Sequence, residues 1–391
     1  MELNIEQEFP ATKNFVYFNN AAISLCPKST LDLIREYTEE RRQAFLREGP
    51  ISVFRRESRW LENVDESKKL FAKVIGAKES EVAFIPNATT GINLIFSMLP
   101  MKKGKNIVTT DIAYPMGAIV CLKQREKGVE TRFVKNVNGE VRIEDFESMV
   151  DDDTVAVFVD QAGWYNGFLY DLKALSEIAH EHGAYLVVDG IQSIGGKRWD
   201  VRKEGVDFLA TSTYKWLLGG PFTQSAGFLY VREEHVDSFQ PVFVGNQTIE
   251  PEQLERNVYE CFDLYDFKYR SGMERFQIYP KYELAYVAVG NSMKLLLSQG
   301  LEKIERKIKR LDTLIIEGVL DYEFELQTPV EEEKRLYVNV KMKNNREVER
   351  KLAERKIIVS ARVGGLRVAP NFYNSEEEVE RFLEGLREVT K

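Results

Sequence analysis

The feature that most constrains the fold is an alternation of short β-branched runs with helical stretches between about residues 80 and 232. The runs "EVAFIP", "NIVTTD" and "VAVFVD" are each followed by a segment of helical character, and the further runs "AYLVVDG", "VDFLATS" and "GFLYVR" complete the series. Such alternation favours a largely parallel sheet that is covered by helices on both faces. We therefore expect an α/β fold with a large domain over residues 21–275.

After about residue 275 the pattern changes. The apolar residues of one predicted helix share a face: Leu301, Ile304, Ile308, Leu311 and Ile315. The segments from "RLYVNV" to "SEEEVERFLEGLREV" then predict a small α+β domain over residues 276–391. A chain of 391 residues suits a large domain and a smaller one. We expect residues 1–20 to pack with the smaller domain.

The composition of the chain limits which kinds of binding partner and which cellular compartment we expect. The net charge is −8, from 54 basic and 62 acidic residues, and there is no basic block, which argues against nucleic-acid binding. No run approaches the ~20 apolar residues that a membrane-spanning helix needs. The N-terminal "MELNIEQEFPATK" lacks the apolar core of a signal peptide. Three widely spaced cysteines without a metal-binding pattern indicate a reduced, cytoplasmic protein.

The three histidines do not suggest catalysis. His180 and His182 lie at the end of a predicted amphipathic helix, and His235 lies in the polar segment "REEHVD". We expect all three on the surface. A serine hydrolase triad or a histidine-ligated metal site would need histidines in a different setting, and we expect no metal.

A single lysine stands in an apolar setting. Lys215 lies between Tyr214 and Trp216 in "STYKWLLGGP", directly after a predicted strand. Burying an unpaired ammonium costs several kcal/mol unless the group loses its proton or is bound covalently, although a surface lysine is the ordinary alternative. Asp189 ends the strand "LVVD" 26 residues upstream. Both residues lie at the carboxyl edge of the predicted sheet, where ligands of such sheets bind.

A third feature is "PNATTGIN", residues 86–93, where Thr89 and Thr90 open a helix. Free backbone N–H groups, hydroxyls and the helix dipole favour a phosphate there, although such residues also serve simply as helix caps. A lysine, a carboxylate and a phosphate site together indicate pyridoxal 5'-phosphate. The lysine would bind its aldehyde, the carboxylate would keep its pyridine nitrogen protonated, and the helix would anchor its phosphate.

The quoted motifs resemble a known family. "LVVDGIQSIGG" and "STYKWLLGGP" with their 26-residue spacing, "FVYFNNAAISLCP" and "LRVAPNFYNSEEEVERFLEGL" are similar to the class V aminotransferase and cysteine desulfurase-like group of fold-type I pyridoxal phosphate enzymes. The resemblance spans nearly the whole chain. It implies a mostly parallel, seven-stranded type of sheet, a small α+β domain, a homodimer with active sites at the interface, and a small amino acid as substrate.

The resemblance also implies residue roles. Lys215 would form the Schiff base with the cofactor and move the Cα proton, Asp189 would pair with the pyridine nitrogen, and Gln192 would donate to the ring phenolate oxygen. The remaining cofactor contacts would be to the phosphate (Thr89, Thr90, Ser212 and Tyr214) and to the two ring faces (Tyr114 and Ile191). Arg367 would clamp the substrate carboxylate, and Asn20 would also contact the substrate.

The chain departs from the desulfurase pattern in several places. Tyr114 stands where desulfurases place a histidine over the ring. The stretch "IIVSARVGGLR" before Arg367 lacks the family's nucleophilic cysteine, and Met273 replaces a threonine that reaches the partner subunit's phosphate. The family's asparagine contact to the ring oxygen has three candidates here: Gln161, Trp164 and Asn166.

These departures favour aminotransfer over desulfuration. A lyase or epimerase without a catalytic cysteine is the alternative with the same first steps. A non-catalytic pyridoxal phosphate-binding regulator is the alternative of a different class, and no appended DNA-binding segment supports it. A dinucleotide-binding protein is disfavoured because no G-x-G-x-x-G follows a strand.

Overall fold

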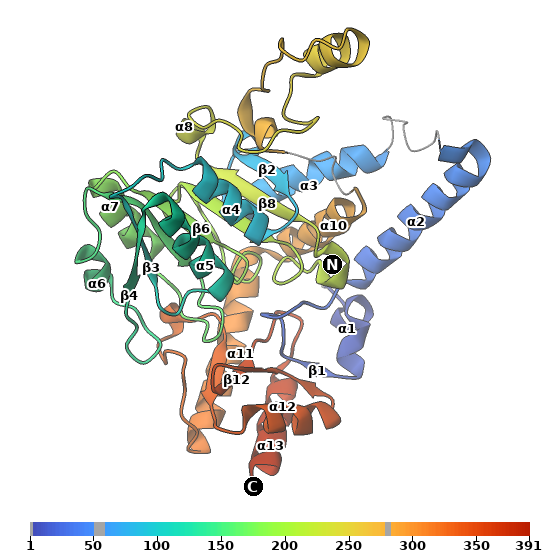
Figure 1. The fold of residues 1–391 in the computed structure, drawn as a ribbon. Helices are drawn as coiled ribbons and strands as arrows, with labels where there is room; N and C mark the ends of the chain where they lie inside the picture. The colour runs from blue at the N-terminus through green and yellow to red at the C-terminus, as the bar shows by residue number, and fades with distance from the viewer. Residues whose placement is uncertain (1–2, 51–58, 278–282) are drawn as a thin grey trace.

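A computed structural model describes residues 3–50, 59–277 and 283–391 (Figure 1). Its main sheet has the strand order β2-β8-β7-β6-β5-β3-β4. The strands are β2 (Val82–Ile85), β3 (Asn106–Thr110), β4 (Glu130–Val134), β5 (Thr154–Asp160), β6 (Tyr185–Asp189), β7 (Phe208–Ser212) and β8 (Gly227–Val231). Only β8 is antiparallel to its neighbours within this sheet. The predicted α/β fold with a mostly parallel sheet is therefore confirmed.

Helices cover both faces of the main sheet. Every residue of β5 is buried, as expected for a strand with helices above and below it. On one face α4 (Ala88–Met98) and α5 (Pro115–Lys123) share a core that includes Ile95 and Val120. On the other face α3 (Arg59–Ile75), α7 (Leu172–Glu181) and α10 (Glu283–Gln299) share a core that includes Phe71, Leu175 and Val289. The sheet therefore offers ligands only its edges.

The C-terminal part forms a second core. Its sheet has the order β11-β12-β9, from β11 (Ser360–Arg362), β12 (Gly365–Val368) and β9 (Val338–Lys341). It packs with α11 (Leu301–Asp321), α12 (Asn345–Glu354) and α13 (Glu376–Thr390). Four of the five residues predicted to share a face of α11 are buried, and Leu301 is half-buried.

The N-terminal segment joins this second core. The short strand β1 (Val16–Tyr17) pairs in parallel with β10 (Ile357–Ile358), and Val16 and Phe18 belong to the C-terminal core cluster. Figure 1 shows the blue β1 beside the red C-terminal elements. The domain boundaries that we expected stay a prediction.

The other elements lie at the periphery. They are the helices α1 (Ile5–Glu8), α2 (Lys28–Glu48), α6 (Ile143–Glu147), α8 (Glu233–Val236) and α9 (Pro251–Gln253), a π-helical turn (Leu254–Glu260), and 3-10 turns at Pro10–Lys13, Glu79–Glu81, Gln124–Lys127, Gly220–Thr223, Gly272–Phe276 and Glu332–Lys334. Residues 240–270, which include α9, form an arm that projects at the top of Figure 1. Among the described helices, none combines the length and the apolar character that crossing a membrane requires.

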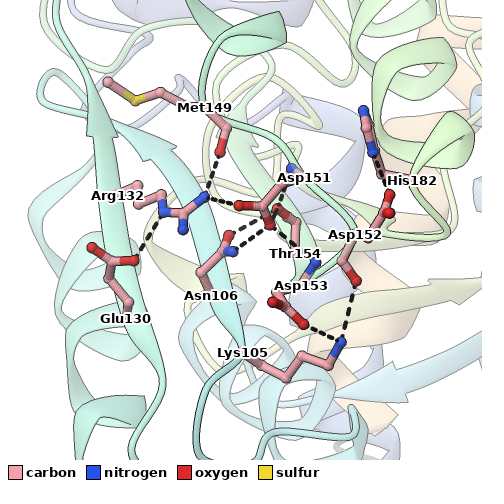
Figure 2. A network of polar contacts seen from close by, with 10 residues as sticks. All are labelled: Lys105, Asn106, Glu130, Arg132, Met149, Asp151, Asp152, Asp153, Thr154 and His182. Carbon is pink, nitrogen blue, oxygen red and sulfur yellow. Dashed lines mark hydrogen bonds and ion pairs between the residues drawn. The ribbon is translucent and has the colours of Figure 1, made fainter.

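Polar side chains at the amino edge of the sheet satisfy one another, as Figure 2 shows. Asp151 precedes β5 and accepts hydrogen bonds from Arg132 Nη1 at 2.6 Å and Asn106 Nδ2 at 2.9 Å. Thr154 Oγ1 in turn donates to Asn106 Oδ1 at 2.8 Å. The hydrogen bond from Arg132 lowers the pKa of Asp151 to about 2.

Asp207, which precedes β7, is a second well-satisfied carboxylate at this edge. Its oxygens lie 2.8 Å from His180 Nε2 and 3.1 Å from His235 Nε2, and it accepts a hydrogen bond from Leu186 N at 2.7 Å. Burial would raise its pKa, but the bonds from the two histidines dominate and lower it to about 2. His180 is exposed, as we expected, although it also contacts this buried carboxylate. The expectation of a plain surface residue is wrong for His235, whose side chain is 18% exposed and bonded to Asp207.

Candidate active site

A cavity of about 540 Å³ opens at the carboxyl edge of the sheet. All the residues that we expected to contact the cofactor line it: Thr89, Thr90, Tyr114, Asp189, Ile191, Gln192, Ser212, Tyr214 and Lys215. The other lining residues are Ala22, Ile23, Asn87, Ala88, Asp160, Trp164 and Gln224. Segments far apart in the sequence thus meet at the edge where parallel α/β sheets bind ligands.

The strand register explains how the polar groups come together. Asp160, Asp189 and Ser212 are the last residues of β5, β6 and β7, which lie side by side. Asp160 and Asp189 are register partners in the β5–β6 ladder. Because the three strands end at nearly the same level, their terminal side chains enter one cavity.

Lys215 follows β7 in a tight turn. The backbone N–H of Leu218 donates to the Lys215 carbonyl at 3.0 Å, and Leu218 has a φ of 60°, a left-handed conformation that costs energy for a leucine. The Lys215 side chain is buried, and within the described part of the chain its Nζ makes no hydrogen bond or ion pair. Burial and then the charge of Arg367 lower the pKa of Lys215. A deprotonated amine of this kind is a nucleophile and a base.

Two carboxylates face this lysine. Asp189 Oδ1 accepts a hydrogen bond from Ile191 N at 3.0 Å, and Asp160 Oδ2 accepts one from Tyr114 N at 2.7 Å. Burial raises the pKa of both carboxyl groups, and the charge of Asp189 raises that of Asp160 further. Our sequence reasoning missed Asp160, although it ends "VAVFVD" just as Asp189 ends "LVVD".

The amino end of α4 supplies an anion site. Asn87 caps the helix, its Oδ1 accepting from Thr90 N at 2.9 Å, and Ser212 Oγ accepts from Ala88 N at 2.8 Å. Thr89 and Thr90 lie in the first turn, beside the cavity. The helix dipole and these hydroxyls favour a phosphate. An unpaired amine, a buried carboxylate and this helix end together fit pyridoxal phosphate.

Side chains with rings and amides complete the cavity wall. Tyr114 meets Trp164 edge to face, with 5.8 Å between the ring centroids. The Tyr214 ring centroid lies 5.6 Å from Lys215 Nζ. Gln192 Nε2 donates to the Ala21 carbonyl at 3.2 Å, while its Oε1 is buried and has no hydrogen-bond partner in the described chain. The expected donation to the ring oxygen would have to come from the second N–H of this amide, and it stays a prediction.

The two residues that we expected to bind substrate do not line this cavity. Arg367 is buried on β12, and its Nη1 donates to the Trp164 carbonyl at 2.6 Å, so the guanidinium contacts the backbone of a cavity-wall residue. Burial lowers its pKa to about 10. Asn20 Nδ2 donates to the Ala369 carbonyl at 2.8 Å, and its Oδ1 accepts from the Tyr373 hydroxyl. Both substrate-binding roles stay predictions.

The candidates for the ring-oxygen contact separate clearly. Asn166 is occupied elsewhere, since its amide donates to the Gly139 carbonyl at 2.7 Å and accepts from Phe168 N at 3.2 Å. Gln161 lines a different cavity. Trp164 lines the active-site cavity and carries no amide. The end of β5 and the loop after it therefore bring Asp160 and the Trp164 indole to this site, and neither is the amide found in the family.

None of the cysteines, all of which the structure describes, lines the cavity. Cys26 is half-buried, and burial followed by the charge of Glu8 raises the pKa of its thiol to about 12. The apolar helix around Cys121 predicts a buried residue, and Cys121 is buried. The aromatic segment "YECFDLYDF" predicts that Cys261 packs in the interior, but Cys261 is exposed on the projecting arm, so that prediction is wrong. A thiolate suited to persulfide chemistry is not available at the site.

Comparison with known proteins identifies the family. The model of the family "Aminotransferase class-V" matches residues 16–382. This chain belongs to the class V aminotransferase family. It is a pyridoxal phosphate-dependent enzyme. The family assignment agrees with the resemblance seen in the sequence.

Among the similar proteins, some are named as cysteine desulfurases and others as aminotransferases. A Pyrococcus abyssi (strain GE5 / Orsay) protein named "Probable cysteine desulfurase" is 29% identical, over 99% of this chain and 97% of that one. The "Uncharacterized aminotransferase YcbU" of Bacillus subtilis (strain 168) is 27% identical, over 84% and 85%. The apo structure of a cysteine desulfurase from Thermococcus onnurineus NA1 matches with a TM-score of 0.87 and 27% identity, over 100% and 98%. The chain thus matches these proteins over most of their length.

Proposed function

We propose that this enzyme is a class V aminotransferase that acts on a small amino acid without using a protein thiol. The observation that carries the proposal is the composition of the cavity: a buried amine, carboxylates and an anion site, with no cysteine in its wall. Cysteine desulfuration needs a thiolate that reaches the substrate sulfur. The β11–β12 hairpin before Arg367, where such a thiol would be carried, is short and contains none.

Each residue then has a defined task. When bound, pyridoxal phosphate supplies an electron-withdrawing ring for an amino acid joined to it. Lys215 Nζ takes the proton from the substrate Cα and returns it, a role that suits an amine of lowered pKa. Asp189 keeps the ring nitrogen protonated. The amino end of α4 holds the phosphate together with Ser212, and Arg367 orients the substrate carboxylate.

A second candidate is a lyase that cleaves a C–S bond without a protein nucleophile. The names of the Pyrococcus and Thermococcus relatives favour sulfur chemistry. Removal of the Cα proton by Lys215 is common to both reactions, so the same residues serve either. The products distinguish them.

The test is to incubate the holoenzyme with each amino acid in turn and to follow the cofactor absorbance. Conversion to the pyridoxamine form with some amino acid is expected, and a keto acid should restore the original spectrum. A variant with all three cysteines replaced by serine is the matched control and should keep this half-reaction. Sulfide release from cysteine that stops when one cysteine is replaced would overturn the proposal in favour of desulfuration.

We also propose a homodimer whose active sites lie at the interface. The projecting arm supports it, because Phe262 and Tyr265 are 76% and 99% exposed there. Met273 is buried, and two nearby groups could replace the family's threonine: Arg270, of which only Nε is bonded within the described chain, to the Ile249 carbonyl at 3.1 Å, and the backbone N–H of Gly272, which donates to Asp237 Oδ1 at 3.4 Å. Sedimentation should give a dimer, and a fully active monomer would refute this arrangement. The cytoplasmic location also stays a prediction.

A further inference from the structure

We propose that Asp160 is a positioning residue that stays protonated, so that the Asp160–Asp189 pair presents one negative charge to the cofactor. This inference rests on the proposed function, because it assigns a role beside the cofactor to a residue outside the set expected from the sequence.

The register places the two carboxylates side by side. Asp160 and Asp189 are paired in adjacent parallel strands, which lie roughly 4.8 Å apart. Both are 3% exposed, and both line the same cavity. Register partners in a parallel ladder project to the same side of the sheet. The two side chains therefore compete for the same donors.

The hydrogen bonds of Asp160 are few. Its Oδ2 accepts from Tyr114 N, but its Oδ1 is fully buried and finds no partner in the described part of the chain. A buried ionised carboxylate with one donor would be costly, because it has about four acceptor sites to satisfy. A neutral carboxylic acid needs fewer hydrogen-bond donors around it, since one oxygen accepts a hydrogen bond and the other carries the proton.

The charged groups around Asp160 also favour its protonated form. The titratable and charged groups that interact with Asp160 are Asp189, Lys215, Cys121, Tyr170 and Tyr337. Among these, Lys215 is the only base, and burial lowers its pKa, so at most one ionised carboxylate has a cation to balance. Burial and the charge of Asp189 raise the pKa of Asp160 well above its ordinary value. When the pyridine ring is bound, its protonated nitrogen again requires one negative charge, which Asp189 supplies.

Asp160 also fixes the residue beside it. The backbone N–H that it holds belongs to Tyr114, the N-cap residue of α5, whose ring lines the cavity. Asp160 thus acts through Tyr114 and Asp189, which makes it a positioning residue.

The test compares two substitutions in the holoenzyme. Asp160→Asn keeps an acceptor for Tyr114 N–H and a donor in place of the O–H, so cofactor affinity should change by less than about threefold. Asp160→Ala removes both and should weaken cofactor binding about tenfold, as expected for one buried hydrogen bond. The infrared difference spectrum between wild type and Asp160→Asn should show the carbonyl band of a protonated carboxylic acid at neutral pH. Asp151→Asn, at the other edge, is the control and should leave that band in place.

Two results would overturn the inference: the absence of a protonated-acid band from the difference spectrum between wild type and Asp160→Asn, or a loss of cofactor affinity in Asp160→Asn as large as in Asp160→Ala. The infrared measurement decides the question even if the alanine variant does not fold. Borohydride labelling of Lys215 tests the proposed function separately. A labelled lysine together with an ionised Asp160 would refute this inference alone.

Discussion

The two edges of the main sheet treat the same residue types in opposite ways. At the amino edge, Asp151 and Asp207 each accept several hydrogen bonds, and the pKa of each is lowered to about 2. At the carboxyl edge, Asp160 and Asp189 each accept one backbone hydrogen bond, and the pKa of each is raised. The strands are common to both edges, so the difference lies in the donors beside each carboxylate. At the amino edge these come from neighbouring strands and helices, such as Arg132 on β4 and His180 on α7.

This contrast shows which polar groups stabilise the fold and which remain available to bind a ligand. The amino edge is complete without a ligand, as the closed network of Figure 2 illustrates. The carboxyl edge holds an amine and carboxylates whose pKa values are perturbed by burial rather than by mutual pairing. Such perturbed groups gather at functional sites. Substitutions at the two edges should therefore have opposite consequences for stability and activity.

The largest effect is expected for Lys215→Ala. Loss of the amine should prevent covalent fixation of the cofactor by borohydride and should lower kcat by roughly a thousandfold, the scale of a lost acid–base group. Folding should be unaffected or improved, because a buried amine without a partner is removed. Peptide mapping of the wild type is the control, and a label on a different lysine would contradict the assignment.

Asp189→Asn should separate activity from stability. We expect kcat to fall about a hundredfold with little change in KM, because the charge acts on the transition state. A carboxyl group whose pKa is raised on folding opposes folding at neutral pH, so the apo variant should be at least as stable as the wild type. Urea unfolding of the apo proteins checks this. A wild-type kcat would show that another group balances the ring nitrogen.

Asp207→Asn should lower the stability of the fold and leave the catalytic activity unchanged. A carboxyl group with a folded pKa of about 2 stabilises the fold above its ordinary pKa, and this stabilisation is lost as the pH falls toward 2. The variant should therefore lose about 2 kcal/mol of unfolding free energy at pH 7. The difference from the wild type should shrink in acid. An equal difference at pH 7 and pH 3 would contradict the assigned cause.

The smallest effect is expected for Asp151→Asn. The Asp151 side chain is 48% exposed, so solvent screens its pairing with Arg132. The loss should be under about 1 kcal/mol and should decrease further in high salt. A loss as large as that of Asp207→Asn would show that the network in Figure 2 acts as one cooperative unit.

Much of the fold and the cavity could be predicted from local sequence. Continuous apolar runs that end in Asp189 or Ser212 marked both the strands and their functional ends, and Lys215 followed from its setting. The roles of His180 and His235 could not be predicted, because they depend on Asp207, 27 and 28 residues away. The same holds for the Arg367 guanidinium, whose contact with the Trp164 carbonyl spans 203 residues.

Asp160 shows a different limit. Its position at a strand end was visible in the sequence, but its importance follows from β5 and β6 being neighbours in register. Strand order is a tertiary property that side-chain patterns do not encode. For the same reason, the insertion of β8 between β2 and β7 was not expected.

The insertion of β8 has a consequence for the order of folding. β7 and β8 are consecutive in the chain and pair through a five-residue antiparallel ladder from Phe208↔Val231 to Ser212↔Gly227. The loop between them carries Lys215 and closes over residues 213–226, whereas the one parallel neighbour of β7, β6, is joined to it by a longer crossover, residues 190–207. Short loops lose less chain entropy on closure, and local contacts form sooner. We therefore expect the lysine-bearing hairpin to acquire protection from hydrogen exchange before the rest of the sheet, so that the reactive amine is in place while its carboxylate partners are still arriving.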